Sequence, residues 1–131
     1  MGQPAAKKGD RILATDTHIV MIPAGAAMVP TLLPHPFTGI IDGALSSNVK
    51  IMGQPAATMN STATNTPSHV PQGGPFQKPP ANKGKILAGS ATVRINGKMA
   101  ARNGDTALTC NDPADLPVGK VVAAGTVFIG G

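Results

Sequence analysis

Residues 89–105 read GSATVRINGKMAARNGD and join a strand pattern to a corner. Apolar and polar residues alternate from Thr92 to Ile95, which is typical of a strand with one buried face. The alternation stops at Gly97, and a pair of alanines and a Gly104-Asp105 step follow. An Asp after a glycine commonly binds backbone N–H groups in a turn. The segment therefore predicts a short strand that leads into a tightly turned corner.

Other parts of the chain repeat this segment. The corner Met52-Gly53-Gln54-Pro55-Ala56-Ala57 copies residues 1–6, and residues 96–101 are a third copy in which Met99 replaces the proline. The strand pattern also occurs at residues 48–53 and at the end of the chain. A short apolar pair after a glycine precedes each strand pattern, at residues 39–41, 84–87 and 119–122. We expect each unit to be a hairpin of these two strands, followed by the corner.

The two ends of the sequence complete one unit between them. The chain begins at a corner without its strand, and residues 126–131 form a strand without its corner. We expect this last strand to pair near the N-terminus and to close a ring of three units, which removes exposed strand edges. The predicted fold class is all-β: three pseudo-threefold β-hairpin repeats that form a short pointed cone. We expect residues 1–131 to be a single tip domain without an effector extension.

The composition supports a small β protein with many turns. The chain has 16 Gly and 13 Pro, no Trp, no Tyr and three Phe, so the core must rely on aliphatic side chains. Many Gly and Pro make long helices improbable. Two Pro-rich insertions, Ile22–Pro36 and Pro67–Pro80, each carry a histidine. We expect both insertions to be ordered loops, and little helix anywhere in the chain.

Charge and targeting signals narrow the function classes. The formal net charge is +5, but the basic residues are scattered and no Trp or Tyr offers a stacking platform, which argues against nucleic-acid binding. One cysteine cannot form an internal disulfide. The longest apolar run is interrupted by Pro23, Gly25 and Pro30, and the N-terminus lacks a signal-peptide pattern.

The three histidines and the cysteine follow the repeats. His18 and His69 each lie twelve residues after the alanine pair of their corner, and Cys110 lies nine residues after Ala101. Equivalent positions in a threefold body lie around its axis, so these side chains could converge, with His35 as the natural fourth ligand. Three imidazoles and a thiolate suit tetrahedral Zn²⁺, and a site with four protein ligands is closed. The sequence therefore predicts a structural zinc site of His18, His35, His69 and Cys110.

The corner and its strand resemble the Pro-Ala-Ala-Arg (PAAR) repeat family. Members carry that motif before Gly-Asp, between Gly-Ser-x-x-Val-x-Ile-x-Gly hairpins, and residues 89–105 are the closest stretch. Met99 departs from the usual Pro, and Lys7 and Thr58 depart from Arg. The resemblance implies a short β cone with a metal near its point, which caps the trimeric spike of a contractile injection machine. Such machines include type VI secretion systems, extracellular contractile particles and phage-like baseplates.

The resulting hypothesis is a structural spike tip rather than an enzyme. Its expected partner is a trimeric β-helical spike of the valine-glycine-repeat type at the base of the cone, with effectors or cargo and transient contact with a target membrane as further partners. We expect the protein to be made in the cytoplasm without a signal peptide, assembled on the baseplate spike and delivered on firing. Two alternatives stay open: a small zinc-dependent hydrolase with a bound water, and an effector-loading adaptor that uses the Pro-rich insertions.

Overall fold

The computed structural model describes residues 2–130. Met1 and Gly131, which begin the first corner copy and end the last strand copy, lie outside the described residues. Residues 2–130 contain only β-strands, turns and irregular segments, as the all-β prediction requires. The strands are β1 (Gln3–Pro4), β2 (Arg11–Ala24), β3 (Ala27–Gly43), β4 (Lys50–Ile51), β5 (Gln54–Pro55), β6 (Thr62–Asn65), β7 (Lys83–Ile86), β8 (Arg94–Ile95), β9 (Lys98–Met99), β10 (Thr106–Thr109), β11 (Leu116–Val122) and β12 (Phe128–Ile129). Within this range there is no helix with the length and apolar character that a membrane crossing requires.

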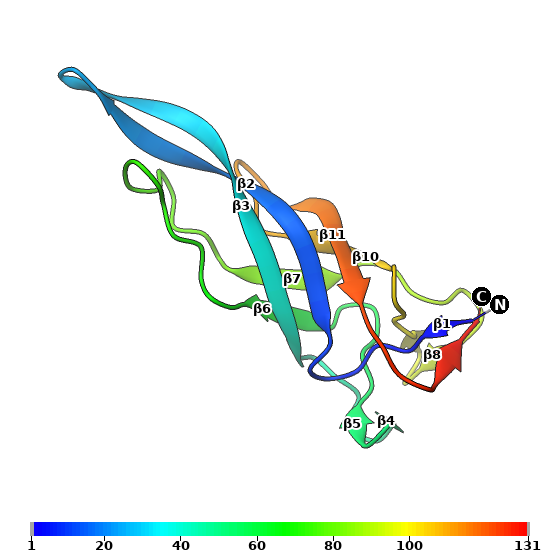
Figure 1. Cartoon of the computed structure of the whole chain (residues 1–131). Coiled ribbons are helices and arrows are strands. Elements are labelled where there is room, and N and C mark those ends of the chain that lie inside the picture. The colour runs from blue at the N-terminus through cyan, green and yellow to red at the C-terminus, as the bar shows by residue number, and fades with distance from the viewer. Residues whose placement is uncertain (1, 131) are drawn as a thin grey trace.

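Six strands form the body of the molecule. Their order is β10-β11-β2-β3-β6-β7, and the sheet closes on itself. Each corner is thus followed by one antiparallel hairpin, namely β2–β3, β6–β7 or β10–β11 (Figure 1). Each of the six strands pairs with a neighbour on both sides, so the described part of the chain closes into a ring, as predicted for three units.

Three small hairpins form the end of the molecule that lies away from the turn between β2 and β3, and we call this end the base (Figure 1). They are β4–β5, β8–β9 and the pair made by β12 with β1 (Figure 1). The pairing of Gln3 with Ile129 confirms that the last strand joins the N-terminus and closes the ring. The predicted pairing of residues 39–41, 84–87 and 119–122 with the strand that follows each of them is wrong. That strand pairs with a corner instead: β4 with β5, β8 with β9 and β12 with β1.

Local turn geometry explains this different pairing. Met52 and Gly53 have φ of 50° and 82°, and Asn96 and Gly97 have φ of 53° and 80°. Two successive residues with positive φ make the tight turn that is favoured in two-residue hairpins. The chain therefore folds back at once after β4 and β8, and the upstream strands remain in the body.

A cycle of backbone hydrogen bonds joins the three corners at the centre of the molecule. Ala6 N–H donates to the Ala101 carbonyl (2.9 Å), Ala101 N–H to Ala57 (3.1 Å) and Ala57 N–H to Ala6 (3.0 Å). All three alanines are fully buried. Because the same bond is made from each repeat to another, the repeats are related by a pseudo-threefold axis.

The Gly-Asp steps have the turn role that the sequence predicts. Asp10 accepts the backbone N–H of Lys7 (3.0 Å), and Asp105 accepts that of Arg102 (2.7 Å). Ser61 Oγ takes this position in the second repeat and accepts the N–H of Thr58 (2.9 Å). Both carboxylates also pair with the side chain of the residue they cap, at 3.2 Å for Lys7–Asp10 and 2.9 Å for Arg102–Asp105.

The first Pro-rich insertion is not a loop, so that prediction is wrong. Residues 22–36 belong to the long β2–β3 ribbon, whose register runs without a break from Arg11↔Ile40 to Ala24↔Ala27. Thr38 directs both its N–H and its carbonyl toward Asn65 and Thr66, away from β2. Backbone direction alternates along a strand, so even-numbered residues of β3 point outward like Thr38. Pro30, Pro34 and Pro36 all occupy such positions, where the missing N–H removes no ladder bond.

The second insertion, Pro67–Pro80, is an irregular loop, as expected. It lies along the outer edge of β2, where Met21 N–H donates to the Pro75 carbonyl (2.8 Å) and Gln77 N–H to that of Ile19 (2.9 Å). Phe76 forms an isolated bridge with Val20 in the same place. This loop covers the end of the six-stranded body that faces away from the base.

The core of the body is built around one aromatic side chain. Phe37 is 1% exposed and packs with Ile12, Ile41, Ile86 and Val121. The second strand of each body hairpin has a glycine that faces the interior: Gly39 in β3, Gly84 in β7 and Gly119 in β11. A Cβ on Gly39 would lie 2.6 Å from Phe37 Cε1, and one on Gly84 would lie 3.2 Å from Phe37 Cζ. Gly39 and Gly84 therefore give Phe37 the room that a side chain would take, while a Cβ on Gly119 would meet Thr109 and Ile12 instead.

Candidate metal centre

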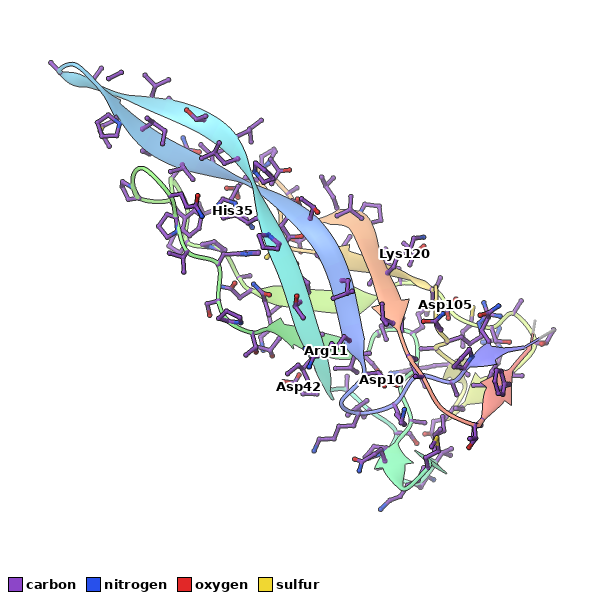
Figure 2. The ribbon with its side chains drawn as sticks, viewed as in Figure 1. Asp10, Arg11, His35, Asp42, Asp105 and Lys120 are labelled. Atoms are coloured by element: carbon purple, nitrogen blue, oxygen red, sulfur yellow. The ribbon has the colours of Figure 1, made fainter. Side chains whose placement is uncertain are left out.

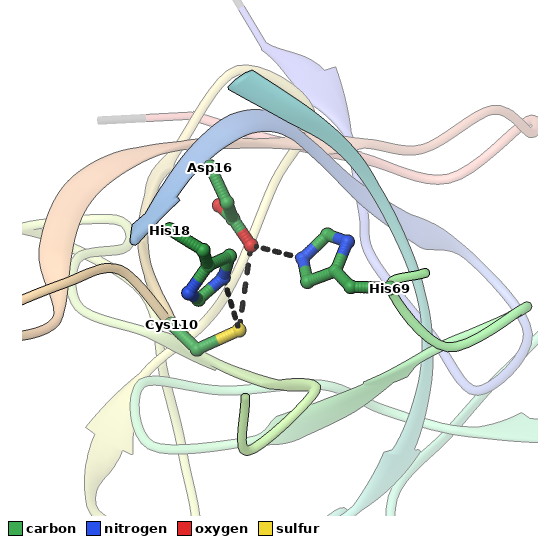
Figure 3. Close-up of side chains that lie close together, drawn as sticks. All are labelled: Asp16, His18, His69 and Cys110. Carbon is green, nitrogen blue, oxygen red and sulfur yellow. Dashed lines mark hydrogen bonds and ion pairs between the residues drawn. The ribbon is translucent and has the colours of Figure 1, made fainter. Parts of the chain in front are cut away.

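Four side chains converge inside the body, beyond Phe37 as seen from the base. Asp16 and His18 come from β2, His69 from the loop after β6, and Cys110 from the residue after β10 (Figure 3). One possible ligand atom from each lies within 4.8 Å of the others. The structure therefore brings together three of the four residues that the sequence predicts as ligands, and it adds Asp16.

The strand period places two of these groups on one face. Residues 12, 16, 18 and 20 of β2 alternate with more exposed neighbours and are buried in the body. Asp16 is 0% exposed and His18 is 1% exposed. An Asp two residues before a His in a strand shares its face. The core thus changes along β2 from the apolar Ile12 to a polar cluster at Asp16 and His18.

Asp16 is the hub of the cluster. Its Oδ2 accepts a hydrogen bond from His69 Nε2 (2.8 Å) and one from the Cys110 thiol (3.4 Å). Its Oδ1 accepts one from the Thr109 hydroxyl (2.5 Å). A buried carboxylate needs such donors, because an uncompensated charge in the interior is costly. Through these hydrogen bonds Asp16 links β2, β10 and the 67–80 loop.

The partners of Asn65 define which ring nitrogen of His69 accepts a hydrogen bond. Asn65 Oδ1 accepts the backbone N–H of Thr38 (2.8 Å), so its amide nitrogen faces His69 Nδ1 at 3.3 Å. That nitrogen also donates to Asn82 Oδ1 (3.1 Å), and Asn82 Oδ1 accepts the N–H of His69 (2.9 Å). His69 Nδ1 is therefore the acceptor, and the ring proton sits on Nε2 and points to Asp16. An ion bound at Nε2 would take the place of this proton, which would have to move to Nδ1.

His18 is held as a neutral imidazole. Burial lowers the pKa of His18, and the nearby Asp112 carboxylate offsets this effect only in part. Its Nε2 lies 3.7 Å from Cys110 Sγ. Its Nδ1 has no hydrogen-bond partner, although Asp112 Oδ2 lies 3.5 Å away. A neutral imidazole with one nitrogen in the cluster is the form that binds a metal ion.

The thiol of Cys110 is protonated in the absence of a metal. Burial raises the pKa of Cys110 to about 11, and the charge of Asp16 acts in the same direction. The residue is 3% exposed, and it is the only cysteine in the chain. Because thiolates are the metal-binding form, a cation that enters the site has to displace this proton.

His35 lies beside the cluster but outside the group of four. It is 5% exposed, and its ring centroid lies 5.6 Å from that of His18 and 5.5 Å from that of His69. The His18 and His69 centroids are 4.9 Å apart. Imidazoles bound to one tetrahedral zinc by about 2.0–2.1 Å bonds have centroids roughly 5 Å apart. His35 Nδ1 lies 3.0 Å from the Leu33 carbonyl, and a proton shared there would leave Nε2 free. His35 as a ligand stays a prediction.

Aromatic rings and a small pocket surround the histidines. The ring of Phe76 lies 5.8 Å from that of His18 and 5.3 Å from that of His35, and Phe37 lies 6.1 Å from His69. A pocket of about 260 Å³ between β3 and the 67–80 loop is lined in part by His35 and His69. The cluster is thus enclosed by apolar groups, with this pocket beside two of its histidines.

The donor set fits a metal ion. Two imidazoles, one thiolate and either Asp16 or His35 supply the nitrogen, sulfur and oxygen ligands that Zn²⁺ takes. The partnerless His18 Nδ1 also fits, because metal-bound histidines commonly direct their other nitrogen to a carboxylate, and Asp112 lies there. A bound ion would supply bonds between three separate segments of the body. Four candidate donors already surround this position, which favours a structural site.

The sequence contained a signal for Asp16. It lies two residues before His18 in a segment of strand-forming residues, so the two side chains share a face. Reasoning from histidine and cysteine alone passed over it. The equal offsets of His18 and His69 were a correct guide to convergence, although β2 continues as a strand through His18 while β6 ends at Asn65.

Comparison with known proteins gives a result for the family. A family model described as the PAAR motif matches residues 30–114 and 76–131, which together span residues 30–131. A search of curated protein sequences finds no match.

Proposed function

The chain belongs to the PAAR motif family, whose members are structural spike-tip proteins; from that premise, we propose that it caps a trimeric β-helical spike of a contractile injection machine. The base would bind the blunt end of the spike, and the opposite end would lead into the target envelope. No bond is made or broken in this role, which agrees with a structural protein rather than an enzyme.

The pseudo-threefold base is the observation that carries this proposal. The alanine cycle and the three base hairpins repeat the same contacts around one axis. A single chain with this symmetry can offer equivalent surfaces to the three subunits of a trimer. The base also exposes apolar side chains, with Met52 at 53%, Val127 at 40% and Phe128 at 60%. Exposed apolar groups on a small domain commonly mark a protein contact.

Binding to the spike is tested with purified components. The chain is mixed with a trimeric spike of the valine-glycine-repeat type from the same gene cluster, and the mass of the complex is measured by light scattering. We expect one tip per trimer. Phe128→Asp should weaken binding, whereas Leu13→Asp, on the outside of the body at 41% exposure, should not. Three tips per trimer, or no complex, would contradict the proposal.

The metal is proposed to be zinc with a structural role. The cluster of Asp16, His18, His69 and Cys110, with His35 beside it, supports this assignment. We expect freshly purified protein to contain about one zinc per chain by elemental analysis. Removal of zinc with a chelator should lower the thermal unfolding midpoint, because a metal that binds only the folded state stabilises it. Less than a tenth of an equivalent of zinc would rule this out.

Delivery is the cellular part of the proposal. The protein would be made in the cytoplasm, assembled on the baseplate spike and expelled on sheath contraction, and it could carry effectors. A strain that lacks the gene should lose sheath-driven delivery, and plasmid-borne wild type should restore it. Unchanged delivery in the deletion strain would show that the tip role is wrong.

A further inference from the structure

The far part of the β2–β3 ribbon extends beyond the body. Figure 1 shows this ribbon reaching past the 67–80 loop, at the end opposite the base. Residues 23–30, which read PAGAAMVP, are all exposed, and we call them the finger tip. The last backbone contact between the ribbon and the loop is the bond from Met21 N–H to Pro75. The finger tip is therefore a two-stranded ribbon without a covering layer.

The finger tip, and the neighbouring loop as far as Gln77, contain no Asp, Glu, Lys or Arg. No Asp, Glu, Lys or Arg occurs between Asp16 and Asp42, or between Lys50 and Lys78. The charged residues labelled in Figure 2, such as Asp42 and Lys120, lie on the body and not on the far part of the ribbon. The finger tip exposes Met28 and Val29 at 45% each, and Leu32 and Val70 nearby are 59% and 67% exposed. In a chain of net charge +5, this end is the uncharged and apolar one.

The backbone of the ribbon also matches an environment without water. A hydrocarbon phase offers no partner to an exposed N–H group, so each free donor is costly there. The outward-facing positions of the ribbon include Pro23, Pro30, Pro34 and Pro36, which have no N–H. Ile19 N–H donates to Asp112 Oδ2 (2.8 Å) and Met21 N–H to Pro75 (2.8 Å). Within residues 19–36, the outward donors that remain on the paired strands are those of Met28 and Leu32.

We propose that the finger tip inserts into the hydrocarbon surface of a lipid bilayer. The proposal rests on the spike-tip function and names the partner of its leading end. The lack of charge on the finger tip favours lipid over a charged protein as its partner. An uncharged apolar surface is compatible with acyl chains, and it has no group that could pair with a charged protein. From Met21 to the turn is about three residues, or roughly 10 Å at 3.3 Å per residue. This reach is less than one leaflet of hydrocarbon, roughly 15 Å, so the insertion is shallow.

The absence of tryptophan allows a direct test. The chain contains no Trp and no Tyr, so Met28→Trp and Leu13→Trp each introduce a single fluorophore. The two sites have similar exposure, 45% and 41%, but Leu13 lies on the outside of the body. With phosphatidylcholine vesicles in 0.5 M NaCl, we expect Met28→Trp to show a blue-shifted emission and quenching by brominated acyl chains. Leu13→Trp should show neither change.

A charge variant gives the second measurement. In a flotation assay with the same vesicles, Met28→Lys should reduce the bound fraction at least tenfold, while Leu13→Lys adds the same charge and should bind like wild type. The circular dichroism spectrum and zinc content of every variant are compared with those of wild type to check folding. If Met28→Lys does not fold, Val29→Lys takes its place in the assay. Equal binding by Met28→Lys and wild type would overturn the proposal.

Three further outcomes distinguish this inference from self-association and from the spike-tip function. Concentration-dependent dimers that Met28→Lys abolishes, without any vesicle binding, would show that the finger tip contacts a second copy and that the lipid proposal is wrong. If the chain forms a one-to-one complex with the spike trimer but does not bind vesicles, the spike-tip function stands and the lipid proposal is wrong. If the chain binds vesicles but not the spike, the lipid proposal stands and the spike-tip function is wrong.

Discussion

At the residue scale, Asp16 connects more segments of the protein than any other side chain of the cluster. It accepts hydrogen bonds from His69, Cys110 and Thr109, which lie 53, 94 and 93 residues away in sequence. A carboxylate in this place can act as a ligand or orient the ligands around it. In both roles its negative charge favours a cation in the cluster.

Asp16→Asn tests this role. The variant keeps the shape of the side chain and removes its charge, so we expect zinc affinity to fall about 10- to 100-fold, the effect typical of groups that orient ligands. Affinity is measured by competition with a chromophoric chelator. Asp42→Asn is the matched control, because Asp42 is an exposed carboxylate on β3 outside the cluster. A change of less than twofold for Asp16→Asn would show that the carboxylate has no part in the site.

His35→Ala distinguishes the two candidates for the fourth ligand. Removal of a group that only orients a ligand lowers metal affinity by at most about 100-fold. If His35 binds the ion itself, His35→Ala should therefore lower zinc affinity by more than this amount. The same chelator competition measures this effect, with His18→Ala as the reference for loss of a ligand. A decrease below tenfold would assign the fourth position to Asp16 and make the prediction for His35 wrong.

Single residues were predictable from the sequence where the residue type is rare. With three histidines and one cysteine, the offsets of His18, His69 and Cys110 were enough to predict their convergence. Asp16 was missed because an aspartate has several common roles and only its position in the strand points to this one. The direction of His35 depends on the ribbon register, which no local pattern specifies.

At the element scale, the β2–β3 ribbon shows that the position of a proline matters more than the number of prolines. A Pro-rich stretch predicts a loop when each proline is counted as a breaker. In this ribbon the prolines fall on outward-facing positions, so the ladder between the two strands stays intact. Outward prolines also prevent further strands from pairing with the edge. The sequence could not reveal this, because the direction of each residue follows from long-range pairing.

Leu33→Pro and Leu32→Pro test the alternation directly. The backbone N–H of Leu33 faces His18 of β2, so proline there removes a ladder bond and should lower the free energy of unfolding by about 2 kcal/mol or more. Leu32 faces outward, and proline there should cost less than about 1 kcal/mol, since no ladder donor is lost. Urea unfolding measures both values. Equal destabilisation by the two substitutions would contradict the assigned directions.

At the scale of the whole molecule, the three repeats have the same hydrogen bonds at their centre and differ in the side chains that they expose. The alanine cycle joins the corners, while the residue before the buried isoleucine of each base hairpin is Lys50, Arg94 or Phe128. The ring, its closure by the termini and the all-β class followed from the repeats alone. The pairing inside each unit did not, because the tight turns after β4 and β8 depend on positive φ at Met52 and Asn96.

Neighbouring residues of β12 separate closure from docking. Ile129 is 7% exposed and packs with Ala5, Ile51 and Ile95, so Ile129→Asp buries a charge and should destabilise the fold by more than about 3 kcal/mol. Phe128 is 60% exposed, and Phe128→Asp should keep the thermal unfolding midpoint of wild type. Differential scanning calorimetry measures both. A stable Ile129→Asp protein would show that the β1–β12 pair does not close the ring.

The pseudo-threefold base has a statistical consequence for binding to a trimer. A tip with three equivalent corners can sit on a threefold partner in three rotations of 120°. Three equal orientations multiply the association constant by three, a gain of about 0.65 kcal/mol at 25 °C that requires no additional contact. Lys50, Arg94 and Phe128 differ, so the three orientations are not equal in free energy. One orientation of the tip on the spike is then preferred, and the statistical gain is smaller than this value.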